Sequence, residues 1–383
     1  FVPTSGLRPE PIPVNLKIIL VGPPRHYDVL FRDDPDFRKL FQVKVEFDTE
    51  IARAAKTELE VAQFIATTCK NESLRPATRD GVAAVVEEAS RMVSDQSRLT
   101  LRFNAIANLL IESDYQAGLM RAKEVARAQV EAALLARKER SGLIERKMIE
   151  AILEGQVLID TQGESVGQLN GLAVYDIGDY DFGKPARITA VTYAGEDGIT
   201  NVERESSLSG RIHDKGVLIL EGWLGAKYAH DGPLALNVSI TMEQSYGYID
   251  GDSASAAELF AVVSSLSEVP IRQDMAVTGS VNQKGEIQTV GGVNQKIEGF
   301  FGICKERGLT GTQGVLIPAQ NVRNLMLHAS VRDAIDAGRF HVYPIAQVDE
   351  GIELLMGMSP ELVHTRVLTN LARYRELSRK YRE

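Results

Sequence analysis

Apolar residues in the second part of the chain follow a helical pattern. Across residues 50–155 they recur three and four positions apart, as at Val82, Val85 and Ala89, and Gly and Pro are almost absent. This spacing places the apolar side chains on one face of a helix. The stretch 114–150 is also rich in Ala, Arg, Glu and Leu, which favour helices. We therefore predict a small all-α bundle over residues 50–155.

The pattern changes after Gly155. Short runs of β-branched and apolar residues appear, separated by Gly-containing turns and by stretches with helical spacing. The predicted strands are Leu172–Tyr175, Ile188–Tyr193, Val217–Leu220, Leu236–Thr241, Met275–Thr278, Gly314–Ile317 and Phe340–Tyr343, and the predicted helices are Ser255–Ser267, Asn294–Lys305 and Arg332–Ala337. Strands and helices mixed in this way indicate a compact α+β or α/β domain.

The two ends of the chain have patterns of their own. Leu16–Val21 is a continuous apolar run before a Gly-Pro-Pro turn, and Val43–Phe47 alternates, so both are predicted as short strands. They are too little chain for a whole α/β domain and are interpreted as the end of one. Pro360–Glu383 is basic and amphipathic, and we expect a helix that packs against the rest of the protein.

These patterns predict a multidomain chain, as its length of 383 residues also suggests. We expect a short α/β segment over 1–49, an all-α domain over 50–155, an α+β domain over 156–358 and a C-terminal helix over 359–383. The composition, 44% hydrophobic and 25% charged, is that of a globular protein and excludes a disordered or fibrous one.

The charge balance and the cysteine count narrow the classes of function. The formal net charge is -9, which argues against a protein that coats nucleic acid or an anionic membrane. The longest apolar runs are too short to span a bilayer, and no signal peptide is apparent. Cys69 and Cys304 are too few for a disulfide framework, which fits a reducing, cytoplasmic location. Because the first residue is not Met, we expect the natural protein to extend upstream.

The first candidate for chemistry is Ser253 in Gly251-Asp-Ser-Ala-Ser255, where an apolar helix is predicted to begin. Ser before a helix is most often an N-cap, and the pattern alone favours that role for Ser253 or Ser255. The alternative is a nucleophile, because the unpaired N–H groups and positive dipole at a helix start would stabilise an oxyanion.

A nucleophilic Ser needs a base. None of the six His residues lies in a Ser-His-Asp signature, which leaves Lys as the alternative. Lys296 begins an otherwise apolar helical stretch and would act as a base if burial lowered its pKa, although its periodicity alone favours a solvated Lys. We find no metal-ligand motif and no G-x-x-x-x-G-K-[ST] phosphate-binding loop in the sequence.

Two motifs resemble those of the Lon proteases, which are Ser-Lys peptidases. Gln244–Ser255 (QSYGYIDGDSAS) resembles the nucleophile motif of the B-type branch, and Gly285–Lys296 (GEIQTVGGVNQK) resembles the lysine motif, with Lys296 following Ser253 by 43 residues as in the family. The resemblance covers about residues 156–358 and outweighs the N-cap and solvated-Lys interpretations.

The resemblance implies roles for individual residues. Ser253 would be the nucleophile, Lys296 the general base, and Thr278 the residue that orients the Lys. Asp250 matches an acidic position near the site and is expected to orient rather than to accept a proton, whereas Asp252 is expected to cap the helix.

The segments before residue 156 resemble the rest of a Lon chain. Pro11–Gly22 and Asp36–Asp48 resemble the end of the AAA+ α/β core, and residues 50–155 resemble its helical lid. Arg102 lies in the sensor-2 region and is a candidate to contact a nucleotide phosphate. The Walker A and Walker B strands are not in this sequence. We therefore expect no cofactor for this chain, and ATP with Mg²⁺ only if an ATPase region lies upstream.

The resemblance implies a serine endopeptidase that degrades unfolded or damaged proteins, with ATP dependence in the full-length protein but not in this chain alone. It also implies a homo-hexameric ring and extended substrates that add as a strand to a sheet edge near Ser253. Nucleic acid and membrane are not expected as partners. The alternative is a ring-forming, substrate-binding or structural module whose proteolytic site is idle.

Overall fold

The computed structural model describes residues 10, 12–178, 180–230 and 232–382 and divides into two compact units, 1–49 and 50–383. The first unit contains helices α1 (Pro24–Asp33) and α2 (Pro35–Leu40), with Phe37 buried against the rings of Tyr27 and Phe41.

The strand predictions for the first unit are wrong. Leu16–Val21 and Val43–Phe47 have no regular secondary structure, and all of these residues are exposed. An apolar run forms a stable strand only where a neighbouring strand pairs its backbone and another layer covers its side chains. The described residues of this unit offer neither.

The second unit begins with the predicted helical bundle. Its helices are α3 (Ala55–Asn71), α4 (Arg79–Arg91), α5 (Phe103–Leu119), α6 (Arg127–Ser141) and α7 (Leu143–Leu153). The residues that share one helical face, such as Val85 and Ala89, are buried in a common core with Ile65 and Leu109, which confirms the helical prediction. A small antiparallel pair, β1 (Glu50–Ala52) with β2 (Arg98–Thr100), was not predicted.

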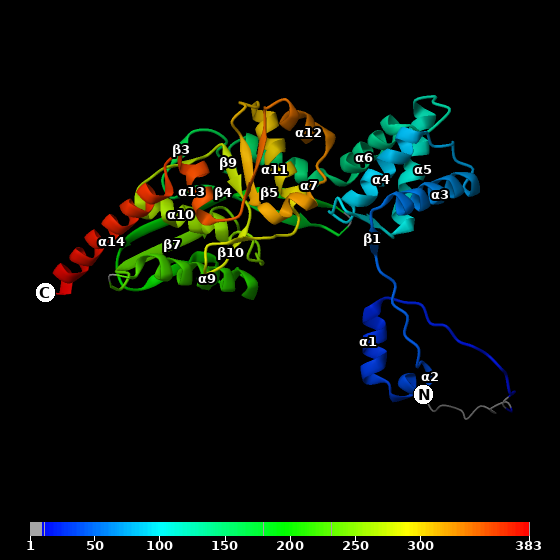
Figure 1. Cartoon of the computed structure of the whole chain (residues 1–383), viewed down its shortest axis with the longest axis horizontal. Helices are drawn as coiled ribbons and strands as arrows, with labels where there is room; N and C mark the ends of the chain where they lie inside the picture. Colours follow the sequence, from blue (N-terminus) through cyan, green and yellow to red (C-terminus); the bar gives the residue numbers. More distant parts are fainter. Residues whose placement is uncertain (1–9, 11, 179, 231, 383) are drawn as a thin grey trace, which may run out of the picture. The chain divides into compact units, whose positions relative to one another are not determined.

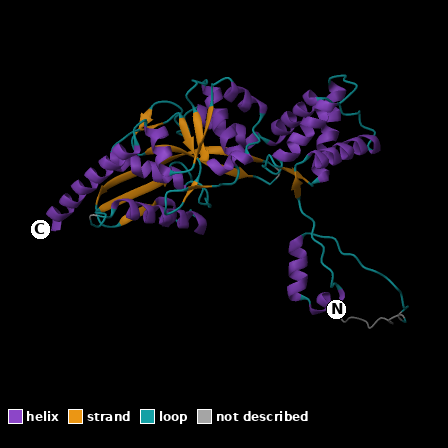
Figure 2. Cartoon of the chain, viewed as in Figure 1, coloured by secondary structure: helices purple, strands orange, loops and turns teal. Residues whose placement is uncertain are grey.

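The rest of the second unit is built on a seven-stranded mixed sheet (Figure 2). Its strand order is β13-β12-β9-β4-β5-β7-β6. The strands are β4 (Gln168–Asp176), β5 (Asp181–Ala194), β6 (Gly198–Asn201), β7 (Leu236–Met242), β9 (Met275–Val277), β12 (Gly314–Pro318) and β13 (His341–Ile345). The strands β4, β9, β12 and β13 run parallel, while β5 pairs antiparallel with both β4 and β7.

Short strand pairs and helices complete this part of the chain. The short strands are β3 (Glu164–Ser165), β8 (Ile271–Arg272), β10 (Ser280–Val281) and β11 (Ile287–Gln288). The helices are α8 (Val202–Glu205), α9 (Arg211–Tyr228), α10 (Ser255–Ser267), α11 (Val293–Arg307), α12 (Ala329–Asp336), α13 (Val348–Met356) and α14 (Pro360–Arg382), with a 3₁₀ helix at Ala319–Asn324. No helix within the described ranges is long and apolar enough to cross a membrane.

Both faces of the sheet are covered, and the strands alternate between the two cores. Met275 and Val277 of β9 point into a core shared with α9, α10, α13 and α14, whereas Ala276 points into a second core shared with α11 and α12. In β12, Leu316 belongs to the first core and its neighbours to the second. Period-two alternation thus places one layer of helices on each face of the sheet.

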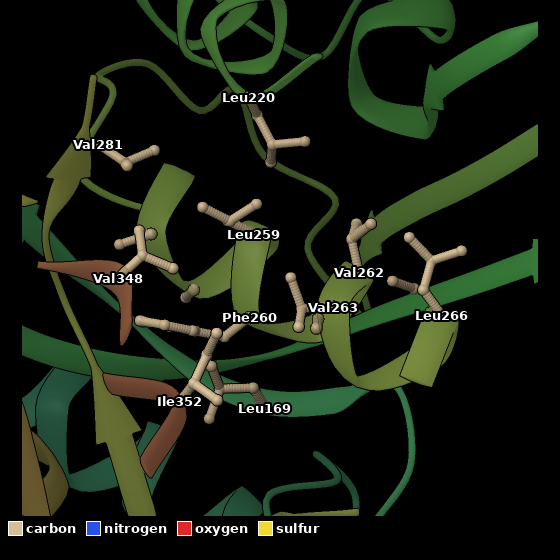
Figure 3. Close-up of a cluster of buried hydrophobic side chains, with 14 of the residues drawn as sticks. Leu169, Leu220, Leu259, Phe260, Val262, Val263, Leu266, Val281, Val348 and Ile352 are labelled. Carbon is tan, nitrogen blue, oxygen red and sulfur yellow. The ribbon is translucent and has the colours of Figure 1, made fainter. Parts of the chain in front are cut away.

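The helix that follows the candidate nucleophile lies at the centre of the first core. Nearly all of α10 is buried. Figure 3 shows Phe260 extending toward Val348 and Ile352 of α13, while Leu259 faces Leu220 of α9. Each fully buried side chain of this size contributes about 1.5–3 kcal/mol, so α10 is among the most firmly held elements of the fold.

One predicted strand is a helix. Val217–Leu220 lies in the middle of α9 (Figure 1) rather than in the sheet. Four consecutive apolar residues look like a buried strand in isolation, but the residues that α9 buries include His213, Gly216 and Trp223, which continue a helical spacing on both sides of the run. The run alone could not show that period.

Helix α11 lies against β5 with backbone touching backbone. A Cβ on Gly183 of β5 would lie 2.0 Å from the carbonyl oxygen of Gln295, and one on Gly299 would lie 2.1 Å from the carbonyl oxygen of Gly183. Neither position has room for a side chain. The helix that carries Lys296 is therefore placed against the sheet at the closest possible distance.

Candidate active site

Three side chains that are far apart in the sequence meet at the start of α10. The Lys296 Nζ lies 2.9 Å from the Ser253 Oγ and 3.0 Å from the Thr278 Oγ1. Thr278 is fully buried and Lys296 is 3% exposed. The structure thus brings together the Ser, the Lys and the Thr that the sequence motifs single out, and the Lys is not solvated.

Backbone hydrogen bonds hold the turn that carries Ser253. The Ser253 carbonyl accepts from the Gly279 N–H at 3.0 Å and from the Thr278 hydroxyl at 3.4 Å, and the Gly279 carbonyl accepts from the Ala256 N–H at 3.1 Å. The end of β9 is therefore tied to the turn from both directions. Thr278 contacts both the Ser253 carbonyl and the Lys296 amine and so fixes their relative position.

Burial changes the acidity of the Lys296 amine. Its removal from water lowers the pKa of Lys296 to about 8, and the nearby Asp252 carboxylate opposes this by favouring the charged form. An amine with a pKa near 8 is partly neutral at physiological pH and accepts a proton more readily than an ordinary Lys. With its Nζ beside the Ser253 hydroxyl, it has both the position and the acidity of a general base.

Neither Ser near the start of α10 acts as a side-chain cap. The N-cap is Ala254, for which no side-chain cap is formed, and the Ser255 hydroxyl accepts instead from the Val281 N–H at 3.1 Å. The N-cap interpretation of Ser253 and Ser255 is therefore wrong. The Ser253 hydroxyl faces the amine.

The two acidic residues before Ser253 have different partners. The Asp250 carboxylate accepts from the N–H groups of Ile212 and His213, at 3.1 and 3.3 Å, and so caps the start of α9. The Gly251 N–H also donates to this carboxylate, and the three hydrogen bonds together lower the pKa of Asp250. Asp252 instead accepts from the Ser280 hydroxyl at 3.0 Å, and its charge acts on Lys296. Asp250 thus caps α9, and Asp252, which was expected to cap the helix after Ser253, bonds to Ser280 instead. The orienting role of Asp250 stays a prediction.

Arg102 lies apart from these residues in the sequence and forms no part of the contacts above. It is exposed and precedes α5, where its backbone N–H donates to the Thr100 hydroxyl at 3.1 Å. Its guanidinium makes no hydrogen bond or ion pair among the described residues, and its contact with nucleotide stays a prediction.

A buried group of ionisable residues that the sequence reasoning missed adjoins the site, and its His213 lines the same cavity as Ser253. The His213 Nε2 is 3.5 Å from the Glu258 Oε1, and Glu203 accepts from the Met242 N–H at 2.8 Å. Burial lowers the pKa of His213 and raises that of Glu258 to about 8, so both are neutral at pH 7. The available signal in the sequence was a charged or polar residue within an otherwise apolar helix. The three residues lie on three separate helices, so the sequence did not show that they meet.

An open cavity of about 560 Å³ adjoins Ser253 and Lys296. Part of its wall is Leu172–Asp176, the second half of β4. In the sheet, β4 pairs with β9 only at Asn170 and Gly171, whereas its pairing with β5 continues to Asp176. Beyond Gly171, the β9 side of β4 therefore has no partner strand among the described residues. Within the described part of the chain, no group of three or more His, Cys, Asp or Glu is arranged to hold a metal.

Three protein-family models match the chain in order. Residues 1–48 match the LonB-like AAA domain, residues 76–140 match the AAA+ ATPase LID domain of archaeal LonB, and residues 236–357 match the C-terminal proteolytic domain of Lon protease (S16). The last of these contains Ser253, Thr278 and Lys296.

Curated proteins resemble the chain over most of its length. A putative Lon protease homolog of Escherichia coli is 35% identical over 92% of the chain, and archaeal Lon proteases of Pyrococcus abyssi and Thermococcus kodakarensis are 28% and 27% identical over 91% and 93% of it. The chain covers 61%, 34% and 53% of these relatives and so spans less than two thirds of each. With the three matched models in the order core, lid and proteolytic domain, the chain is similar to Lon proteases in each of these parts, and its first two parts match models of the LonB type.

Proposed function

We propose that this chain hydrolyses peptide bonds with Ser253 as the nucleophile and Lys296 as the general base. The observation that carries the proposal is the 2.9 Å distance between the Lys296 Nζ and the Ser253 Oγ in a site where burial lowers the pKa of the amine. The Ser253 Oγ attacks the carbonyl carbon and gives its proton to the neutral Lys296 amine. The ammonium then protonates the leaving amine, and water hydrolyses the acyl-enzyme by the reverse sequence.

The oxyanion formed in this reaction needs hydrogen-bond donors. The N–H groups of Ser253 and Ala254 lie where α10 begins, and the described residues provide no hydrogen-bond acceptor for them. Donors of this kind at a helix start are suited to a developing negative charge. We assign them to the oxyanion, with Thr278 holding Lys296 in place.

We infer that the substrate is an extended polypeptide. The free edge of β4 at Ala173–Asp176 lies along the cavity that contains Ser253. A strand added at this edge would be bound through its main chain, with little demand on sequence. Such binding suits unfolded proteins, in which the backbone is accessible, and the names of the relatives are consistent with proteolysis.

The wider context of the activity is part of the same proposal. We propose the domain boundaries 1–49, 50–155, 156–358 and 359–383, and a homo-hexameric ring that encloses the sites. ATP and Mg²⁺ enter the proposal only for a protein that also carries the phosphate-binding strands, where Arg102 would contact nucleotide.

The test is the cleavage of an unfolded protein by the chain and its variants. Ser253→Ala and Lys296→Met should each abolish cleavage, whereas Ser265→Ala, on the same helix but bonded to Thr192, should not. Cleavage by Ser253→Ala at the rate of the unsubstituted protein would refute the nucleophile assignment. A peptide boronate, which bonds covalently to a nucleophilic Ser, separates the proposal from the alternative of an idle site, which would bind unfolded protein and form no adduct.

A further inference from the structure

A second, smaller cavity of about 330 Å³ lies beside α7. Its wall is almost entirely apolar, and the apolar residues are Leu143, Ile144, Met148, Ala151 and Val157. We refer to this surface as the α7 groove. Two lysines, Lys147 and Lys184, complete its rim.

The apolar face of α7 that forms this groove is not needed for the fold. The helix buries Ile152 in a small core with Ile159 and Ile303, whereas Leu143 is 56% and Ile144 is 47% exposed. Single exposed apolar residues are common on protein surfaces, but neighbouring ones that line a hollow are typical of a binding site.

The groove is continuous with the candidate active site. Val157 and Lys184 line both the α7 groove and the cavity that contains Ser253. Lys184 lies on β5, directly opposite Ala173, whereas the free edge is on the other side of β4. A chain along this edge is therefore separated from the junction of the two cavities by the width of β4, which a long side chain can cross.

The amine at this junction contacts an aromatic ring and not a carboxylate. The Lys184 Nζ lies 5.5 Å from the centre of the Tyr175 ring, and no carboxylate pairs with it among the described residues. Burial lowers the pKa of Lys184. Its four-carbon stem adds apolar surface at the entrance, while its amine can donate to a backbone carbonyl of a passing chain.

We propose that the α7 groove is a substrate subsite that binds a large apolar side chain of an extended polypeptide, several residues from the bond that Ser253 cleaves. The inference rests on the proposed function and adds a preference to it: segments rich in Leu, Phe or Met, which folded proteins bury, are bound more tightly than polar ones. The main chain would be held at β4, and the groove would supply the selectivity.

A binding measurement tests the subsite without requiring catalysis. In the Ser253→Ala background, a fluorescein-labelled extended peptide with one Leu or Phe is titrated by fluorescence anisotropy, and the apolar residue is moved along an otherwise Ser- and Gly-rich sequence. One position should bind about ten-fold more tightly than the all-polar peptide. Ile144→Asp should remove this gain, and the milder Ile144→Ser should reduce it. Leu119→Asp, at a 63% exposed position on α5, is the matched control and should leave it intact.

Cleavage by the chain with Ser253 intact then separates the two proposals. The same peptide position should raise kcat/KM about ten-fold through KM, and Ile144→Asp should cancel this effect, whereas the control Leu119→Asp should keep both the effect and the cleavage of the all-polar peptide. Cleavage without any positional preference, or a preference that survives Ile144→Asp, would overturn the subsite and leave the proteolytic function standing. If nothing is cleaved but the positional binding persists, the proteolytic function fails instead.

A change of oligomer size in Ile144→Asp, measured by light scattering and without an effect on peptide binding, would show that a second copy of the chain occupies the groove and would also overturn the subsite.

Discussion

Arg91 of α4 holds Glu298 of α11 through two parallel hydrogen bonds of 2.8 Å, although they are 207 positions apart in the sequence. Both side chains are mostly buried, and Glu298 also accepts from the His328 N–H at 2.9 Å. Since Glu298 lies two residues beyond Lys296, this pair links the helical bundle to the helix that carries the candidate base.

Arg91→Ala should lower the free energy of unfolding by about 3 kcal/mol, because it leaves the buried Glu298 carboxylate unpaired. Urea denaturation measures the loss. The control is Arg373→Ala, which breaks an ion pair with Glu268 in which both side chains are more than half exposed. That change should cost less than about 1 kcal/mol. Equal losses in the two variants would contradict the importance assigned to the Arg91–Glu298 pair.

The rate of peptide cleavage should rise with pH with a midpoint near 8. Lys296 accepts a proton only when neutral, and its pKa is lowered to about 8. Below that pH the ammonium predominates and the rate falls. The pH dependence of kcat/KM for a short peptide measures this limb directly, and a flat profile from pH 6 to 9 would argue against Lys296 as the base.

Asp252→Asn should move this rising limb to lower pH. The Asp252 carboxylate favours the charged form of Lys296, so its loss lowers the pKa of the amine further. Asp250→Asn is the matched control. It should leave the limb where it is and reduce thermal stability, because Asp250 caps α9. A shift in the control but not in Asp252→Asn would assign the effect on Lys296 to Asp250 instead.

Thr278→Val should reduce kcat roughly ten-fold, which is the effect of one lost hydrogen bond to the Lys296 amine. The two side chains have nearly the same shape, so the fully buried position stays filled. Thr278→Ser keeps the hydroxyl and should retain most of the activity. Thermal denaturation of both variants checks that the fold is intact. Equal activity in Val and Ser variants would remove Thr278 from the site.

Glu258→Gln should stabilise the protein at pH 8 and make less difference at pH 5. Burial and the nearby Glu203 raise the pKa of Glu258 from 4.5 to about 8. Between these values the native state holds a proton that the unfolded state releases, so the stability of the unsubstituted protein falls as the pH rises through this window. The Gln variant lacks this penalty. Urea denaturation at both pH values, with exposed Glu306→Gln as the control, measures the difference.

Features that depend on neighbouring residues in the sequence were predictable. The spacing of Val85 and Ala89 correctly indicated a helix, and the runs at Leu172–Tyr175 and Leu236–Thr241 are strands of the sheet. The motifs around Ser253 and Lys296 also predicted which side chains would meet, because they resemble the paired motifs of the Ser-Lys peptidases. The helices that follow them, α10 and α11, belong to the cores on opposite faces of the sheet.

Features that depend on the folded surroundings were not predictable. Asp250 and Asp252 are nearly equivalent in the sequence, but the start of α9 binds one of them and Ser280 the other. In the same way, the apolar run at Leu16–Val21 has no strand to pair with among the described residues. The partners of Glu258, Asn201 at the end of β6 and His213 on α9, precede it by some forty or more residues. Local pattern carries no information on such partners.

The contact between Gly183 and Gly299 means that the distance between the Ser253 hydroxyl and the Lys296 amine depends on how closely α11 packs against β5. A single methyl group at either glycine would wedge α11 off the sheet and draw the amine away from the hydroxyl, while every residue that touches the substrate stayed the same. In a random-mutagenesis screen for loss of cleavage, substitutions at Gly183 and Gly299 should therefore be found as often as substitutions at Ser253 and Lys296. A higher peptide concentration should not restore the cleavage rate of these variants, because the substitution changes the alignment of the Lys296 amine with the Ser253 hydroxyl and not the binding of the peptide.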